Sequence, residues 1–525
     1  MSFKKFYQEN KFLLANISLF LIFFFYSYNT YLYVYDGHHH GLIFSNALDL
    51  LKGKEPYKEI FIQYGLLTTF FHSLVLKLFG EQIIIINIFT IIIYLLSVFL
   101  ISLTIKNLTN EFYALIAAVL ILFNHPIPWL PWPNYLAFFF IVGFIYLHLA
   151  KKPLFILLSG FLLGLACLAR ENYIIFVIPS LIFMMLFLSV FEDRNRSYFK
   201  KFILVSFGFI LPLLLFSIYL FYNGLAGIWL KYFLLPFVYI QDVHQTTFLS
   251  LIKNFITFFA SDAIFNFISK PQYLLITIIL IVNSFFLFNQ IFLIKNKKFD
   301  IIFISIISLL SSIVSINFEL FRLYTSVILG IIIVFYLINQ IKDIYFKKFF
   351  LVFLSIISIY SIIFYPSGNN KIFIKTVKSY KSFNEISYFK KQKWAKNKTD
   401  SLSKISKLKK SILKNCNIDY SINMTFDTFN VLALDLNNFH IIPYRTTDVN
   451  KLSIDKYFTG EDNYFDKINQ ELNNQNLILL IDENNYLHDM SKINLSNYSY
   501  EKINLNSDVE KPMVLRLFYP TDCLN

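Results

Sequence analysis

A stretch near the N-terminus concentrates the side chains that could take part in a reaction. Residues 31–64 hold an aspartate, three consecutive histidines, further acids and a Pro-Tyr turn, while the sequence on both sides is largely apolar. A carboxylate can act as a general base, and histidine, glutamine and tyrosine side chains can hold a polar substrate through hydrogen bonds. The candidate catalytic residue is Asp36, and the candidate substrate-binding residues of this stretch are His38, His39, Glu55, Tyr57, Gln63 and Tyr64.

Three further candidates lie far along the chain. Arg170 and Glu171 form a charged pair between two apolar runs, which is costly in a membrane unless the pair lines a polar cavity. Arg322 stands at the start of another apolar run, in NFELFRLYTS. Because guanidinium groups bind phosphate well, we predict that the two arginines bind a phosphate and that Glu171 shapes the pocket. A purely structural ion pair is the alternative for Arg170 and Glu171.

The histidine run raises the question of a metal site. Three histidines that are neighbours in sequence cannot all converge on one ion, and no second group of ligands has suitable spacing. We therefore expect no metal and no cofactor, with a divalent metal at His38–His40 as the less favoured alternative.

The composition describes the elements that must position these residues. Of the 525 residues, 56% are hydrophobic and only 15% are charged, with a mean hydropathy of +0.56. These values exclude a disordered chain, a nucleic-acid-binding domain and a small disulfide scaffold, so no nucleic-acid partner is expected. They indicate a polytopic membrane protein whose surrounding partner is membrane lipid.

Apolar runs long enough, or nearly long enough, to cross a bilayer recur along residues 1–366. The segment 64–79 is also apolar, but counting it as a span would place the lysine-rich loops outside, so it is interpreted as a juxtamembrane helix. The eleven predicted spans lie at about 12–28, 83–105, 112–124, 134–149, 154–169, 172–190, 202–222, 272–294, 300–316, 324–341 and 348–366.

The distribution of lysine and arginine predicts the orientation. The N-terminus and the loops at 150–153, 191–201 and 342–348 are rich in positive charge, which is typical of cytoplasmic segments. The candidate residues then all fall on the outer side. An odd number of spans places the C-terminus outside as well.

Beyond residue 366 the sequence changes character. Residues 367–414 form a basic neck, with 14 lysines between 371 and 414, and this runs against an outer location, although the charge rule is weak for long translocated domains. Residues 415–525 alternate short apolar runs with polar stretches, which predicts a small soluble α/β or α+β domain. Cys416 and Cys523 either pair in an oxidising compartment or remain free thiols.

The first long loop resembles that of the GT-C integral-membrane glycosyltransferases. The shared pattern is an aspartate soon after the first span (D-G-H-H-H-G from Asp36), a small-residue helix, a G-x-x-P-Y turn at 53–57 and an aromatic juxtamembrane helix that ends in L-F-G at Gly80. The segment GLACLARENYIIFVIP at 164–179 is similar to a later helix pair of that family. The bacterial branch of lipopolysaccharide galacturonosyl- and aminoarabinose-transferases and protein O-mannosyltransferases is the most similar.

This resemblance implies a fold and a reaction. The expected fold class is an all-α polytopic membrane protein of about eleven transmembrane helices, GT-C-like, with a small C-terminal α/β or α+β domain. Asp36 would be the catalytic carboxylate in an inverting sugar transfer from a polyprenyl-phosphate donor to a hydroxyl of a glycolipid, polysaccharide or protein. The expected location is the bacterial cytoplasmic (inner) membrane, with the N-terminus cytoplasmic and the C-terminal domain periplasmic.

Departures from the family pattern leave some points open. Asn134 stands where members often have an aspartate, and Gly37 stands where many have an acid. The donor sugar, the acceptor and the oligomeric state are not defined by the sequence. A transporter or flippase of lipid-linked sugars is the alternative function, although the repeated halves typical of transporters are not found.

Overall fold

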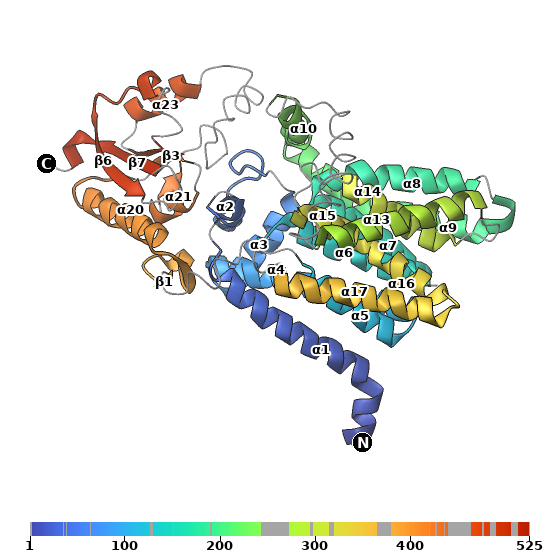
Figure 1. The fold of residues 1–525 in the computed structure, drawn as a ribbon. Helices are drawn as coiled ribbons and strands as arrows, with labels where there is room; N and C mark the ends of the chain where they lie inside the picture. The colour runs from blue at the N-terminus through green and yellow to red at the C-terminus, as the bar shows by residue number, and fades with distance from the viewer. Residues whose placement is uncertain are drawn as a thin grey trace.

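A computed structural model of the chain shows a helical bundle and a mixed α/β domain, with helix α2 (His39–Leu51) between them (Figure 1). The structure describes residues 3–34, 36–37, 39–62, 65–125, 130–150, 152–189, 192–242, 272–293, 298–313, 320–364, 380–418, 420–425, 428–434, 436–438, 464–474, 477–482, 490–505 and 513–523.

Helices occupy each of the eleven runs that the sequence predicts to be spans. Within the described residues, six helical segments are each long and apolar enough to cross a membrane, and shorter apolar helices accompany them. The bundle helices are α1 (Phe3–Tyr31), α4 (Ile83–Leu108), α5 (Glu111–Phe123), α6 (Pro133–His148), α7 (Pro153–Ala169), α8 (Ile174–Ser189), α9 (Glu192–Tyr222), α13 (Gln272–Phe288), α14 (Phe299–Ile313), α15 (Leu320–Val327), α16 (Ile331–Gln340) and α17 (Ile344–Phe364). The protein is therefore a multi-pass membrane protein.

Close contact between α7 and α9 depends on residues without side chains. A Cβ atom added at Gly160 of α7 would overlap the carbonyl oxygen of Val205 on α9, and one added at Gly208 of α9 would overlap the carbonyl oxygen of Leu157. Lipid tails are as apolar as leucine, so helices in a membrane gain little by merely hiding apolar surface. Small residues instead allow the two backbones to approach and pack.

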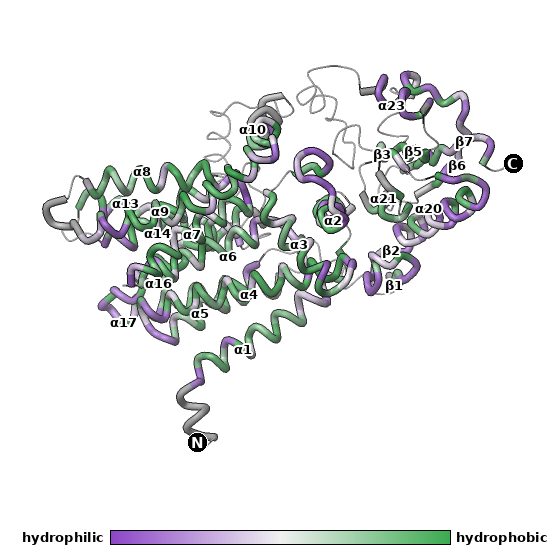
Figure 2. The backbone as a smooth tube through the Cα atoms, turned by 180° about the vertical axis from the view of Figure 1, so that it is seen from behind, coloured by the Kyte–Doolittle hydropathy of each residue, from purple (hydrophilic) through white to green (hydrophobic). Residues whose placement is uncertain are grey.

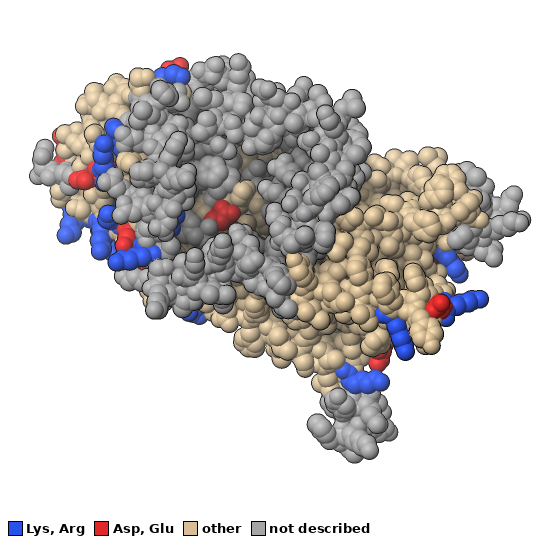
Figure 3. All heavy atoms as spheres, viewed as in Figure 1, with Lys and Arg blue, Asp and Glu red and all other residues tan. Residues whose placement is uncertain are grey.

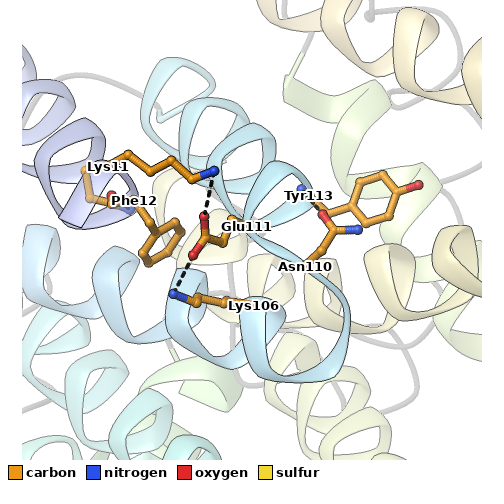
Figure 4. Close-up of polar contacts among 7 residues, drawn as sticks. Lys11, Phe12, Lys106, Asn110, Glu111 and Tyr113 are labelled. Carbon is orange, nitrogen blue, oxygen red and sulfur yellow. Dashed lines mark hydrogen bonds and ion pairs between the residues drawn. The ribbon is translucent and has the colours of Figure 1, made fainter. Parts of the chain in front are cut away.

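The far end of the bundle, where α4 passes to α5, is held by charged side chains. Glu111 lies 2.8 Å from the Nζ atom of Lys106 on α4 and 4.0 Å from that of Lys11 on α1 (Figure 4). The Lys106 ammonium also lies 4.4 Å from the ring centroid of Phe12. On the face seen in Figure 3, lysine and arginine gather at this end and around the C-terminal domain, while the flank of the bundle between them is neutral. This distribution matches a bundle embedded in lipid.

The C-terminal domain is built on a five-stranded mixed sheet of order β4-β3-β5-β7-β6. Strand β3 runs parallel to β4 and β5, whereas β7 is antiparallel to β5 and β6. The strands are β3 (Tyr420–Met424), β4 (Asn437–Asn438), β5 (Leu477–Asp482), β6 (Tyr498–Leu505) and β7 (Met513–Pro520), and the helices are α20 (Lys396–Asn415), α21 (Thr428–Leu434) and α23 (Tyr464–Asn474). In Figure 2, α20 and α23 are far more hydrophilic than the helices of the bundle.

Part of the predicted basic neck belongs to this domain. Residues 380–415 form the antiparallel strands β1 (Tyr380–Phe383) and β2 (Gln392–Ala395) and then helix α20. The apolar side chains Leu402, Ile405 and Ile412 of α20 are fully buried. Of the two alternatives for the cysteines, the structure shows the disulfide, which joins Cys416 after α20 to Cys523 near the C-terminus.

Candidate active site around Asp36

Asp36 lies in the short connection between α1 and α2, at the domain-facing end of the bundle. Its Oδ1 atom accepts a hydrogen bond of 2.9 Å from the backbone N–H of His39, so the side chain caps the first turn of α2. Its Oδ2 atom lies 3.3 Å from Nδ1 of His39. The Asp36 side chain keeps 23% of its surface exposed, so a substrate can reach the carboxylate.

Two opposing effects set the charge of this carboxylate. Burial raises the pKa of Asp36, but the hydrogen bonds and the charge of His39 lower it, and the net pKa lies below the ordinary value for aspartate. Asp36 is therefore ionised at neutral pH. The His39 ring is fixed in turn by Trp132, whose ring centroid lies 4.7 Å away.

A buried polar cluster lies directly behind the capping turn. Nε2 of His40 lies 2.8 Å from Oδ1 of Asn87 on α4 and 3.5 Å from the hydroxyl of Tyr31 on α1. All three side chains are fully buried. Burial is the main cause that lowers the pKa of His40 to about 4, so this histidine is neutral at physiological pH. The cluster anchors the start of α2 to two bundle helices.

The G-x-x-P-Y turn meets the charged corner between α7 and α8. The Tyr57 hydroxyl donates a hydrogen bond of 2.9 Å to Oε1 of Glu171, and both side chains are buried. Tyr57 has a φ of 66°, a left-handed conformation that is uncommon for a residue with a side chain. The ring of Tyr232 on α10 (Ala226–Asp242) covers it, with ring centroids 5.5 Å apart. Strain of this kind persists where surrounding contacts impose it, here the bond to Glu171.

Helix α3 (Leu66–Phe79), which follows the first loop, is docked on the same corner. The hydroxyl of Thr68 donates to the carbonyl oxygen of Ala169 at 2.9 Å. Gly65 approaches so closely that a Cβ atom there would overlap that same carbonyl oxygen. The end of the first loop and the residue before Arg170 are thus held in direct contact.

The predicted site residues fall into separate groups. Asp36 and His39 contact each other, and Tyr57 and Glu171 contact each other. Glu55 is exposed and forms an ion pair of 2.8 Å with Lys58 on the surface of the loop. Arg170 is almost buried, and its guanidinium carbon lies 5.6 Å from the ring centroid of Tyr173. Outside the described residues lie His38, Gln63, Tyr64 and the side chain of Arg322, whose backbone belongs to α15.

Two contributors were not among the predicted site residues. Trp132, which precedes α6, contacts the ring of His39. Asn87 interrupts the run IIIINIF, and an isolated polar residue in a membrane-spanning run is a signal of a buried polar contact. Among the described residues, no three His, Cys, Asp or Glu side chains gather closely enough to hold a metal ion.

Two solved structures align with most of this chain. The oligosaccharyltransferase of Archaeoglobus fulgidus, solved with Zn and sulfate, aligns over 92% of this chain and 71% of its own, with a TM-score of 0.50 and 11% identity. ArnT from Cupriavidus metallidurans, solved with undecaprenyl phosphate, aligns over 97% of this chain and 98% of its own, with a TM-score of 0.43 and 10% identity. No family model and no curated protein matches the sequence.

At such low identity the likeness to the oligosaccharyltransferase establishes the fold. The expected fold, an all-α polytopic GT-C-like membrane protein with a small C-terminal domain that contains a sheet, is confirmed.

Proposed function

We propose that the protein transfers a sugar, with inversion, from a polyprenyl-phosphate donor to an acceptor hydroxyl of a glycolipid, polysaccharide or protein. The reaction takes place at the outer face of the bacterial cytoplasmic (inner) membrane. The observation that carries this proposal is the ionised, partly exposed carboxylate of Asp36 at the domain-facing end of a membrane bundle. The fold shared with an oligosaccharyltransferase is compatible with it.

Asp36 acts as the general base in this reaction. The acceptor oxygen attacks the anomeric carbon from the face opposite the phosphate, a new C–O bond forms, and the bond between that carbon and the phosphate oxygen breaks. The hydroxyl proton passes to Asp36, and the polyprenyl phosphate departs with the bonding electrons. Since phosphate is already a good leaving group, the second carboxylate that glycosidases use as an acid is not required.

The two arginines take the phosphate charge in this proposal. Arg170 stands at the α7 corner that the first loop contacts through Tyr57 and Glu171, and Arg322 lies on α15. Positive groups near a departing phosphate stabilise the charge that develops in the transition state. The outer location is supported by the Cys416–Cys523 disulfide, because such bonds persist in oxidising compartments.

Replacement of Asp36 by asparagine tests the proposal. Asparagine caps a helix as well as aspartate does, so Asp36→Asn should fold but lose the base, which lowers the rate by roughly 10²-fold to 10⁴-fold. Membrane vesicles that contain the protein are supplied with a panel of undecaprenyl-phosphate-linked hexoses and pentoses, and released undecaprenyl phosphate is measured.

Asp343→Asn is the matched control. Asp343 also caps a helix, accepting from the backbone N–H groups of Tyr345 and Phe346 at 2.8 and 3.0 Å, but it lies in the loop between α16 and α17. This variant should keep full activity. Full activity of Asp36→Asn would remove Asp36 from the chemistry, and movement of intact donor across the vesicle membrane without release of its phosphate would favour a flippase.

A further inference from the structure

The C-terminal domain reaches back to the segment that directly precedes Asp36. In strand β2, the backbone N–H of Lys393 donates to the carbonyl oxygen of Leu32 at 2.7 Å. The indole Nε1–H of Trp394 donates to the carbonyl oxygen of Val34 at 2.9 Å. The N–H groups of Leu32 and Val34 bond back to the last turn of α1. Strand β2 therefore supplies hydrogen-bond donors to the carbonyl groups of Leu32 and Val34, which lie beyond the C-terminal end of α1.

An aromatic wedge, formed by Phe389, Trp394 and Phe429, stands behind these two bonds. Its three side chains are fully buried, and each pair of rings has centroids 5.1 Å apart. Phe429 also contacts the ring of His40 in the first turn of α2, with centroids 6.0 Å apart. The wedge thus touches the chain on both sides of Asp36.

A second contact fixes α2 itself. Tyr388, in the turn between β1 and β2, packs edge-on against Phe44 in the middle of α2, with centroids 5.9 Å apart. Both side chains are buried. The hairpin therefore holds the segment before Asp36 by hydrogen bonds and the helix after it by aromatic packing.

We propose that the β1–β2 hairpin is the device that positions the Asp36 carboxylate, with Trp394 as its main positioning residue. This inference rests on the proposed function and gives the C-terminal domain a role in it. A general base must lie within hydrogen-bond reach of the proton it removes, and an error of about 1 Å can cost roughly 10²-fold in rate. The connection that carries Asp36 is short and irregular, so its precision depends on the elements packed against it.

Trp394→Phe tests the role of the indole N–H. Phenylalanine keeps an aromatic ring in the wedge, removes the donor to Val34 and leaves part of the buried indole's volume unfilled. Hydrogen–deuterium exchange is measured on the full-length protein in detergent. Peptides that cover 32–37 should exchange faster than in the wild type, and peptides from α4 should not change. Tyr500→Phe, at a 45%-exposed position of β6, is the control and should leave all of these rates unchanged.

Lys393→Pro provides an independent variant in case Trp394→Phe unfolds the domain. The N–H of Lys393 points away from β1 and serves Leu32, so proline there removes that one bond from an edge strand. It should also raise exchange at 32–37. Unchanged exchange in a folded variant of either kind would overturn the inference.

The activity assay separates positioning from mere stability. Trp394→Phe should lower kcat roughly tenfold or more, with little change in KM for the undecaprenyl-phosphate-linked donor. The acid limb of its pH profile should move to higher pH, because a displaced Asp36 loses the stabilising contact with His39 while it stays buried. Within the described part of the chain, His40 on α2 and Tyr31 on α1 are further titratable groups coupled electrostatically to Asp36. A lower amount of folded enzyme would reduce the rate without moving that limb.

The two proposals can fail separately. Faster exchange at 32–37 in Trp394→Phe, together with full activity of Asp36→Asn, would support the contact between the hairpin and this segment. The same result would overturn the role of Asp36 as the general base. Unchanged exchange together with an inactive Asp36→Asn would do the reverse.

Discussion

At the scale of single residues, the contact between Asp36 and His39 keeps the carboxylate ionised, as the proposed reaction requires of a base. Burial alone would favour the protonated acid, which cannot accept a proton. His39 outweighs that effect through two hydrogen bonds and its charge. Trp132 holds the imidazole of His39 against the carboxylate. A residue between α5 and α6 thus helps to keep Asp36 ionised.

Removal of the imidazole should therefore move the pH dependence of transfer. Because the pKa of Asp36 is lowered in the folded enzyme, the active carboxylate persists above that pKa and is lost as the pH falls through it. His39→Phe keeps an aromatic ring against Trp132 but removes the side-chain bond to Asp36, so the pKa of Asp36 rises and the acid limb of kcat/KM should shift to higher pH. His39→Asn, which can still donate to Asp36, should shift it less. An unmoved limb in His39→Phe would contradict the role given to His39.

At the scale of elements, the docking of α3 on the α7 corner depends on one glycine. Gly65 has a φ of +103° and lies against the Ala169 carbonyl, whereas Gly80 at the other end of α3 has a nearly equal φ of +106° and open space around its Cβ position. Both positions have a positive φ that favours glycine. They differ only in what a side chain would meet.

Alanine at each glycine separates conformation from contact. Both Gly65→Ala and Gly80→Ala should lose about 1 to 3 kcal/mol of stability, because their positive φ with extended ψ is a backbone conformation that residues with a Cβ atom rarely adopt. Gly65→Ala should lose more than that, because the added methyl group overlaps Ala169 and moves α3 away from the corner. Thermal unfolding in detergent and the rate of sugar transfer should both show this order. Equal losses in the two variants would mean that the close approach at Gly65 does not stabilise the fold.

The elements were more predictable from the sequence than the contacts between them. Apolar runs mark helices directly, because a chain in lipid must satisfy its own backbone hydrogen bonds. The helix predicted at 64–79 is present as α3 (Leu66–Phe79). The bond between Tyr57 and Glu171 joins residues 114 positions apart, and no local pattern encodes such a pairing. The same holds for Trp394 and Val34, and for this reason the sequence assigned the C-terminal domain no role at the site.

At the scale of the whole molecule, the disulfide closes the C-terminal domain on itself. Cys416 and Cys523 are 107 positions apart, so their bond joins the end of α20 to the end of the chain and encloses the whole sheet. Cys167 is a free, buried thiol in α7. The oxidation state of Cys416 and Cys523 can therefore be measured for the domain, while Cys167 serves as the free thiol of the bundle.

A mass-tagged maleimide can count these thiols. When the protein is extracted from cells, denatured without reductant and labelled, only Cys167 should react, giving one added tag. After reduction, three tags should be added. The Cys416→Ser variant should show two tags without reductant, which confirms the pairing. Three tags on the unreduced wild-type protein would contradict an outer location for the C-terminal domain.

The contact between Trp394 and Val34 can form only late in the synthesis of the chain, because Trp394 is added long after Val34. Its two partners are 360 positions apart, and every predicted span of the bundle except the first lies between them. At about 5 to 20 residues per second, a ribosome needs roughly 20 to 70 s to pass from one to the other. During that interval a nascent chain can insert all its helices while the loop of Asp36 still lacks the partner of its Val34 carbonyl. A product that is truncated or stalled before Trp394 therefore reaches the membrane without the hydrogen bond that holds the segment before Asp36.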